Sequence, residues 1–203
     1  MDGTQGCCQV LDCCGNSCSH QPEHFETALN TMDIKGMKVT VLGLGKSGAS
    51  AAELLCGRGA EVTVTDCLGE EDLREGVWKL RNRKVKFFLG SDGAGAVEGA
   101  DVIVVSPGVG PEASALRLAE KKGIRVISEV ELFSWFCRLP VIAITGTNGK
   151  TTTAAIVAKL LSKAGCRVKL AGNIGIPLTG IVKELEGEEK IVAEISSFQL
   201  ERI

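Results

Sequence analysis

The side chains with the clearest chemical potential lie in one short run, Thr-Gly-Thr-Asn-Gly-Lys-Thr-Thr at residues 145–152. The backbone amides of a glycine loop can surround phosphate oxygens, a lysine can reach the terminal phosphates, and the next hydroxyl can bind Mg²⁺. The run departs from the standard phosphate-binding pattern, because Ile144 stands where that pattern has its first glycine. The residues that we expect to bind phosphate are Gly146, Thr147, Asn148, Gly149, Lys150, Thr151 and Thr152.

Two further motifs follow this loop, Gly-Asn-Ile-Gly at 172–175 and Glu-Ile-Ser-Ser-Phe-Gln-Leu-Glu at 194–201. Glu194 ends a predicted strand beside the one that carries the glycine loop, where its carboxylate can complete a Mg²⁺ site with Thr151. A glutamate at a strand end is more often simply solvated. Its pairing with Gly-Lys-Thr favours the metal-binding interpretation.

An earlier glycine loop, Gly-Leu-Gly-Lys-Ser-Gly at 43–48, follows a predicted strand and begins a predicted helix. In that context the pattern is typical of a dinucleotide or a nucleoside diphosphate site, and Asp66 at the next strand end can accept hydrogen bonds from a ribose or a base. Ser-Pro-Gly at 106–108 ends another strand at the same edge of the sheet. A purely structural glycine turn remains the alternative.

Alternating strands and helices position these loops. The pattern predicts an α/β fold of two parallel-sheet units, joined near residues 138–140. Pro111 is expected in a first helical turn, and Gly123 at a helix end. The predicted strands are 39–42, 62–65, 85–89, 102–105, 125–127, 141–145, 166–170 and 190–195, and the predicted helices are 46–58, 70–81, 111–122, 129–137, 150–164 and 178–186.

Composition excludes several classes of protein. Of the 203 residues, 44% are hydrophobic and 24% are charged, which is typical of a globular chain, and the 25 glycines occur in clusters without a collagen-like repeat. The formal net charge of −2 gives no electrostatic signature of nucleic acid or anionic membrane binding. We find no membrane-spanning run and no signal-peptide pattern, so we expect a cytoplasmic protein.

The first 31 residues differ from the rest. Five of the nine cysteines lie within residues 7–18, and both histidines, His20 and His24, follow closely. The spacing matches no standard zinc motif. We therefore favour a disordered tail or a misplaced start over a metal site, with Met32 or Met37 opening the folded part. The remaining four cysteines are scattered and imply no disulfide framework.

The motifs together resemble the Mur ligase superfamily. The resemblance is carried by the two glycine loops, Gly-Asn-Ile-Gly, Ser-Pro-Gly-Val at 106–109, Glu-Leu-Phe at 131–133 and the run at 194–201, which occur in order from about residue 32 onward. It implies a Rossmann-like domain at 32–138 that binds a UDP substrate, followed by the first part of a P-loop-type, ATP-binding central domain at 139–203.

The resemblance is strongest to the member that joins D-glutamate to UDP-N-acetylmuramoyl-L-alanine in peptidoglycan precursor synthesis. It implies an ATP- and Mg²⁺-dependent ligase that works as a monomer through an acyl-phosphate intermediate. Lys150 and Glu194 would be catalytic, and Thr151 and Glu194 would bind the metal. The substrate-binding positions that it implies are Gly45, Lys46, Ser47, Asp66, Cys67, Ser106, Pro107, Gly108 and Asn173.

The same resemblance implies parts that these 203 residues do not show. The family has a third domain for D-glutamate, and its central domain carries a histidine and a carbamylated lysine for the metal. We therefore expect that the isolated 203-residue chain does not turn over substrate. Three alternatives remain open: a non-catalytic protein that binds a UDP-sugar or nucleotide, an NAD(P)-dependent oxidoreductase, and a folylpolyglutamate synthetase.

Overall fold

A computed structural model of the chain describes residues 32–187 and 189–200. The predictions for residues 1–31, with their cysteines and histidines, lie outside the described residues. Within the described part, no helix is both long and apolar enough to cross a membrane.

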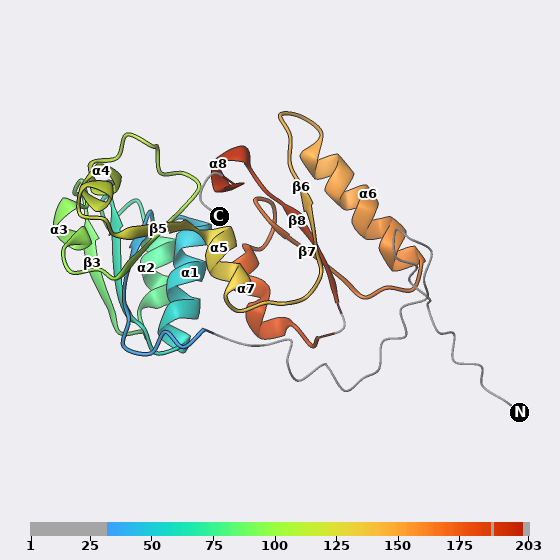
Figure 1. The fold of residues 1–203 in the computed structure, drawn as a ribbon, viewed down its shortest axis with the longest axis horizontal. Coiled ribbons are helices and arrows are strands. Elements are labelled where there is room, and N and C mark those ends of the chain that lie inside the picture. The colour runs from blue at the N-terminus through green and yellow to red at the C-terminus, as the bar shows by residue number, and fades with distance from the viewer. Residues whose placement is uncertain (1–31, 188, 201–203) are drawn as a thin grey trace, which may run out of the picture.

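Eight strands and eight helices follow one another along the described residues, in the alternating order that the sequence predicts (Figure 1). The strands are β1 (Lys38–Leu42), β2 (Glu61–Asp66), β3 (Val85–Leu89), β4 (Val102–Val105), β5 (Arg125–Ser128), β6 (Val141–Ile144), β7 (Val168–Gly172) and β8 (Lys190–Glu194). The helices are α1 (Lys46–Gly57), α2 (Arg74–Leu80), α3 (Ala94–Val97), α4 (Ser114–Lys121), α5 (Glu129–Ser134), α6 (Lys150–Lys163), α7 (Leu178–Ile181) and α8 (Ser197–Leu200), with a short 3-10 turn, η3 (Val182–Glu184), after α7.

The first sheet has five strands in the order β3-β2-β1-β4-β5, and every neighbouring pair is parallel. Its central strand β1 pairs Val41 with Val64 on one side and with Val104 on the other. These β-branched side chains are almost completely buried, as expected for strands that helices cover on both faces. The prediction of a Rossmann-like parallel sheet is confirmed.

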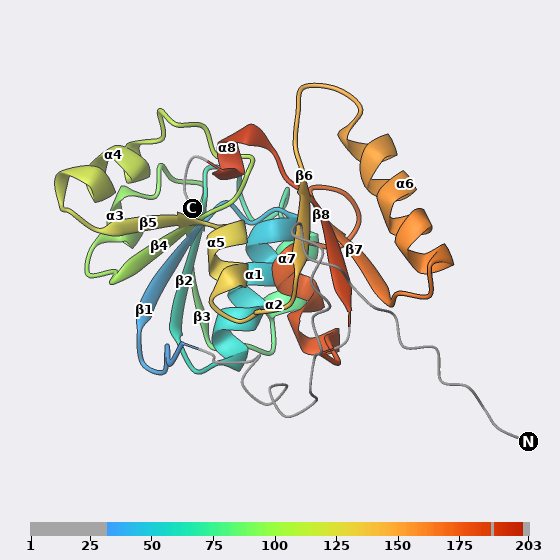
Figure 2. The ribbon, with the colours of Figure 1, turned by 45° about the vertical axis from the view of Figure 1, so that its right-hand side comes forward.

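Side chains of β1 and β4 alternate between two buried clusters, one on each face of this sheet. Val41 and Val104 belong to the cluster that α1, α2 and α5 cover, whereas Leu42 and Ile103 belong to the cluster under α3 and α4. Figure 2 shows α1 and α5 on one side of the sheet, with α3 and α4 at the other. This period-two alternation is what places helices on both faces.

The second sheet has three parallel strands in the order β6-β8-β7. Its central strand β8 is buried, and α6 lies along the side of the sheet that faces away from the first sheet (Figure 1). Of the residues of α6, all of which the structure describes, only Ala154 is buried. Apolar side chains such as Ile156 and Leu160 are consequently exposed on this helix.

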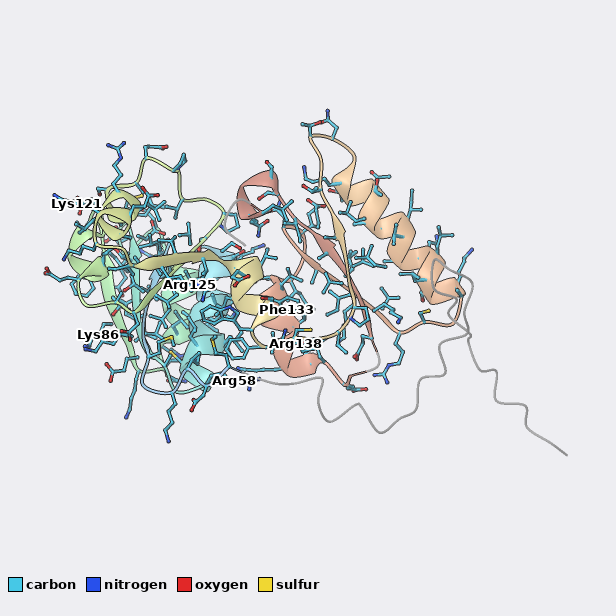
Figure 3. The ribbon with its side chains drawn as sticks, viewed as in Figure 1. Arg58, Lys86, Lys121, Arg125, Phe133 and Arg138 are labelled. Atoms are coloured by element: carbon cyan, nitrogen blue, oxygen red, sulfur yellow. The ribbon has the colours of Figure 1, made fainter. Side chains whose placement is uncertain are left out.

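Helix α7 joins the two sheets. It contacts α1 and α5 of the first unit and β7 of the second, and it lies between the sheets in Figure 1. Ile181 of α7 is in the same buried cluster as Leu55 of α1 and Phe133 of α5, and Phe133 is labelled at this junction in Figure 3. One continuous core therefore runs from one sheet to the other. A domain boundary near residues 138–140 stays a prediction.

Two helices begin later than the sequence predicts. The helix expected at 111–122 begins at Ser114, because residues 110–113 form a turn that the Ala113 N–H closes on the Gly110 carbonyl at 3.2 Å. Pro111 therefore precedes the helix and is not in its first turn. The helix expected at 70–81 likewise begins at Arg74, after a turn over residues 69–73.

Other boundaries shift without changing the architecture. The helix expected at 178–186 splits into α7 and the 3-10 turn η3, and the one expected at 129–137 ends at Ser134. Strand β7 begins two residues later than predicted, at Val168. The sequence analysis missed α3 and α8, because four residues are too few to show a helical period.

Candidate functional site

A cavity of about 670 Å³ opens at the carboxyl ends of β1, β2 and β4. In an open parallel sheet, ligands bind where the strand order reverses, here between β1 and β4. All nine substrate-binding residues that the resemblance implies lie around this cavity, from Gly45, Lys46 and Ser47 to Asn173. The structure thus brings the predicted set together, whereas binding itself stays a prediction.

The glycine loop and helix α1 form one wall of the cavity. A Cβ on Gly48 would lie 1.8 Å from the Gly43 carbonyl oxygen, so that glycine is required where helix and loop meet. Gly45 stands at the N-cap position before helix α1 and supplies no side-chain cap, and the first turn of the helix, which the structure describes in full, has no acidic residue. The N–H groups of Lys46 and Ser47 have no partner within the helix and are available to an anion.

Two polar side chains form hydrogen bonds with the loops around the cavity and hold them in place. Asp66 accepts the Leu44 N–H on one carboxylate oxygen at 2.7 Å and the Leu68 N–H on the other at 3.0 Å. The Ser106 hydroxyl donates to the Gly43 carbonyl at 2.8 Å. Asp66 and Ser106 therefore hold the loops after β1, β2 and β4 in one arrangement. A direct contact from Asp66 to a ribose or a base stays a prediction.

The sequence analysis missed part of the lining. These residues follow β2 and β3 or begin α4, and their position at the carboxyl edge of the sheet was the available signal. They are Leu68, Ser91, Asp92, Gly93 and Ser114.

The second glycine loop connects β6 to the start of α6. Gly149 has a φ of 76° immediately before the helix, and α6 begins without a side-chain cap. The Lys150 Nζ donates to the Gly146 carbonyl at 2.7 Å, so the lysine folds over its own loop. Its cation therefore lies where a phosphate held by the loop would need it.

Glu194 and Thr151 meet beside this loop. Glu194 ends the central strand β8, with Ile144 and Gly172 as its register partners, and the residue is only 4% exposed. The Thr151 hydroxyl donates to a Glu194 carboxylate oxygen at 2.9 Å. Two hard oxygen donors this close suit Mg²⁺, which usually takes few protein ligands and completes its shell with waters and phosphates.

The described residues contain no group of three or more His, Cys, Asp or Glu side chains placed to hold a metal ion. A cation at Thr151 and Glu194 would therefore need a nucleotide phosphate or water to complete its coordination.

The Gly-Asn-Ile-Gly motif connects the two candidate sites. A Cβ on Gly172 would lie 2.3 Å from the Glu194 carbonyl oxygen, and the φ of Gly172 is +115°, so only glycine fits there. The next residue, Asn173, donates its backbone N–H to the same Glu194 carbonyl at 2.8 Å and also lines the first cavity. Asn173 therefore both lines the cavity and bonds to the strand end whose Glu194 side chain meets Thr151.

Family models agree with this arrangement. Residues 37–128 match the Mur ligase MurD-like N-terminal domain, and residues 144–202 match the Mur ligase middle domain. The chain belongs to the Mur ligase family. The residues that match the N-terminal domain of Mur ligases form the first sheet, and those that match the middle domain contribute to the second.

Curated relatives of this Mur ligase chain include two bacterial proteins named UDP-N-acetylmuramoylalanine--D-glutamate ligase. The chain is 44% identical over 172 residues to the one from Geobacter metallireducens, covering 85% of this chain and 38% of that protein. The one from Pelobacter propionicus is also 44% identical over 172 residues, with 39% of its length covered. The Mur ligase chain thus spans about two fifths of these relatives.

Among solved structures, the Mur ligase chain is similar to UDP-N-acetylmuramate:L-alanyl-gamma-D-glutamyl-meso-diaminopimelate ligase from Neisseria meningitides. The two are 21% identical with a TM-score of 0.51, and the match covers 80% of this chain and 55% of that one. This likeness shows the fold alone.

Proposed function

We propose that these residues supply the nucleotide-sugar site and part of the ATP site of a ligase that joins D-glutamate to UDP-N-acetylmuramoyl-L-alanine in peptidoglycan precursor synthesis. The observation that carries the proposal is the place of Asn173. It lines the cavity at the first sheet and bonds to Glu194 beside the second glycine loop. A substrate in the cavity would then extend toward the phosphate-binding loop.

The cavity would hold the UDP end of the substrate. The uncapped start of α1 presents backbone N–H groups and the positive end of the helix dipole to a diphosphate. Asp66 and Ser106 keep the surrounding loops fixed, which lowers the cost of ordering them around the nucleotide. Cys67 and Asn173 line the same cavity, from opposite sheets.

The second loop would hold ATP. Its amides would surround the phosphates, and Lys150 would exchange its bond to the Gly146 carbonyl for the β- and γ-phosphates. Thr151 and Glu194 would bind Mg²⁺, which supplies charge neutralisation during phosphoryl transfer. The transfer would activate the alanyl carboxylate as an acyl phosphate, since a carboxylate alone is a poor acyl donor.

The choice of D-glutamate as the amine rests on the names of the relatives, which are 44% identical to this chain. We also propose that the protein is cytoplasmic, and that it is a monomer as the family resemblance implies.

Calorimetric titration of the 203-residue chain tests the assignment. UDP-N-acetylmuramoyl-L-alanine and ATP with Mg²⁺ should each bind, and neither should displace the other, because they occupy different loops. NADH serves as the opposing ligand, since the first glycine loop also fits a dinucleotide. Binding of NADH that UDP-N-acetylmuramoyl-L-alanine does not displace would contradict the proposal and favour an oxidoreductase.

A further inference from the structure

A carboxylate is buried at the junction of the two sheets. Glu129 is the first residue of α5, directly after the Ser128 hydroxyl that caps this helix, and it is only 1% exposed. It belongs to the first unit, but it faces α7 of the second. Burial raises the pKa of Glu129 despite two hydrogen bonds that lower it. A carboxyl group in such a place calls for an explanation, because a buried charge is costly.

Both hydrogen bonds come from one residue of the other unit. The Glu129 Oε1 atom accepts the Thr179 backbone N–H at 2.6 Å and the Thr179 hydroxyl at 2.8 Å, across fifty positions of sequence. The Thr179 N–H and hydroxyl both donate to the same Glu129 oxygen, so these two hydrogen bonds fix Thr179 in both position and orientation. We call this pair the Glu129–Thr179 clasp.

Thr179 is connected to Asn173 by a short closed turn. The Gly172 N–H donates to the Ile176 carbonyl at 2.9 Å, and α7 begins two residues after Ile176. The other end of the turn is fixed on β8, where the Asn173 N–H bonds to Glu194. The clasp and β8 together leave this turn little freedom to move.

An exposed ion pair between described residues also crosses the junction, and it is weaker. Lys183 of η3 and Glu53 of α1 form an ion pair at 3.2 Å, but their side chains are 50% and 28% exposed. Partial burial raises the pKa of Glu53, and the Lys183 and Lys79 ammonium groups outweigh that effect and lower it. Such exposed pairs contribute little to structure. The buried clasp is therefore the stronger constraint.

We propose that Glu129 is a positioning residue, which through Thr179 holds Asn173 in its place at the nucleotide-sugar cavity. Glu129 does not line the cavity, so it acts without touching the ligand. The inference rests on the proposed function, because it takes the occupant to be a UDP-sugar. It explains why an acceptor is buried where an apolar residue could pack.

The experiment is a double-mutant cycle on the affinity of the 203-residue chain for UDP-N-acetylmuramoyl-L-alanine. Asn173→Ala should weaken binding about tenfold, the usual effect of losing a hydrogen bond to a charged group. Glu129→Ala should weaken it by a similar factor. In the Asn173→Ala background, however, Glu129→Ala should cost less than about twofold, since the effects of coupled residues do not add.

Two further variants separate positioning from general damage. Glu129→Gln keeps an accepting oxygen and should restore the affinity of the unaltered chain. Glu131→Ala lies on the same helix and breaks bonds to Arg125 and Trp135 within the first unit, so its affinity should not change. If Glu129→Ala fails to fold, Thr179→Val removes only the hydroxyl donor, and a loss of about twofold or more that vanishes beside Asn173→Ala supports the proposal.

The outcomes distinguish the two proposals. Two results would overturn the positioning role and leave the proposed function in place. One is a double variant whose loss of affinity is the product of the two single losses, and the other is a Glu129→Gln variant that binds as weakly as Glu129→Ala. If the unaltered chain does not bind UDP-N-acetylmuramoyl-L-alanine, the proposed function fails, and the positioning role fails with it.

Discussion

At the scale of single residues, the candidate sites depend on close approaches between backbone and side chain. Asp66 and Ser106 bond to the loops that surround the cavity, and Thr151 bonds to Glu194 beside the second loop. In each case a side chain with a function in the proposed reaction already has a structural partner. Substitutions here should therefore act through loop geometry as well as through lost ligand contacts.

Gly48→Ala should abolish nucleotide-sugar binding. Its Cβ would lie 1.8 Å from the Gly43 carbonyl, and neither backbone segment can yield without moving the loop. We expect at least a hundredfold loss of affinity for UDP-N-acetylmuramoyl-L-alanine by calorimetry. Gly57→Ala, on the same helix and with ordinary contacts to Lys183, is the control and should bind normally. Equal affinities for the two variants would contradict the predicted role of the loop.

Lys150→Ala should weaken ATP binding about tenfold or more, because the phosphates lose a charged donor. The matched control is Lys159→Ala, on the same helix but exposed and in its third turn. It should leave ATP affinity unchanged. Titration of each variant with ATP and Mg²⁺ checks the pair, and a similar loss in both would show that only the general charge of α6 matters.

At the scale of elements, helices that face the candidate sites begin differently from one that faces the core. Both α1 and α6 begin at a glycine without a side-chain cap, whereas the Ser128 hydroxyl caps α5 by accepting the Glu131 N–H at 3.2 Å. An uncapped start leaves N–H groups for an anion, and a capped start stabilises its helix internally. Helices α2, α3, α4 and α7 also begin without a side-chain cap, so an uncapped start permits anion binding but does not by itself mark a binding helix.

The buried carboxyl of Glu129 should make α5 and α7 sensitive to pH. Because its pKa is raised in the folded protein, the folded state binds the proton more tightly than the unfolded state. The stabilisation is complete below the ordinary glutamate pKa and is lost as pH rises through the raised value. Thermal unfolding from pH 4 to 8 should show the parent losing stability relative to Glu129→Gln as pH rises. Parallel curves would contradict this.

At the scale of the whole molecule, the two sheets share one buried cluster. It extends from Val41 and Leu55 in the first unit to Ile181 and Ile191 in the second. A core that is continuous across α7 couples the two units in folding. It also fixes their relative placement, on which the position of Asn173 in the cavity depends.

Ile181→Ala should destabilise both units together, by about 2–5 kcal/mol, since it opens a void in the shared core. Urea unfolding followed by fluorescence of the buried Trp135 and by far-ultraviolet circular dichroism should give one shifted, coincident transition. Ile156→Ala removes a side chain that is 53% exposed on α6 and should change stability by less than about 1 kcal/mol. Separate transitions for the two probes would show that the sheets fold independently.

Much of this was predictable from local sequence. Short β-branched or apolar runs of three to six residues predicted all eight strands, because strand periodicity and turn residues are local signals. The glycine loops predicted phosphate sites for the same reason. Helix starts such as Ser114 were less predictable, since a turn and a first helical turn have similar residues.

The sequence by itself determined the parallel α/β class, the family resemblance and nine of the residues that line the cavity, since these depend on short motifs and on their order. Only the tertiary structure decided that Asn173 joins the two candidate sites, that Asp66 fastens loops and that Glu129 holds Thr179. These pairs lie 22 to 50 positions apart or in different sheets. No local pattern specifies such contacts, because they arise only when the strands have paired and α7 has packed between the sheets.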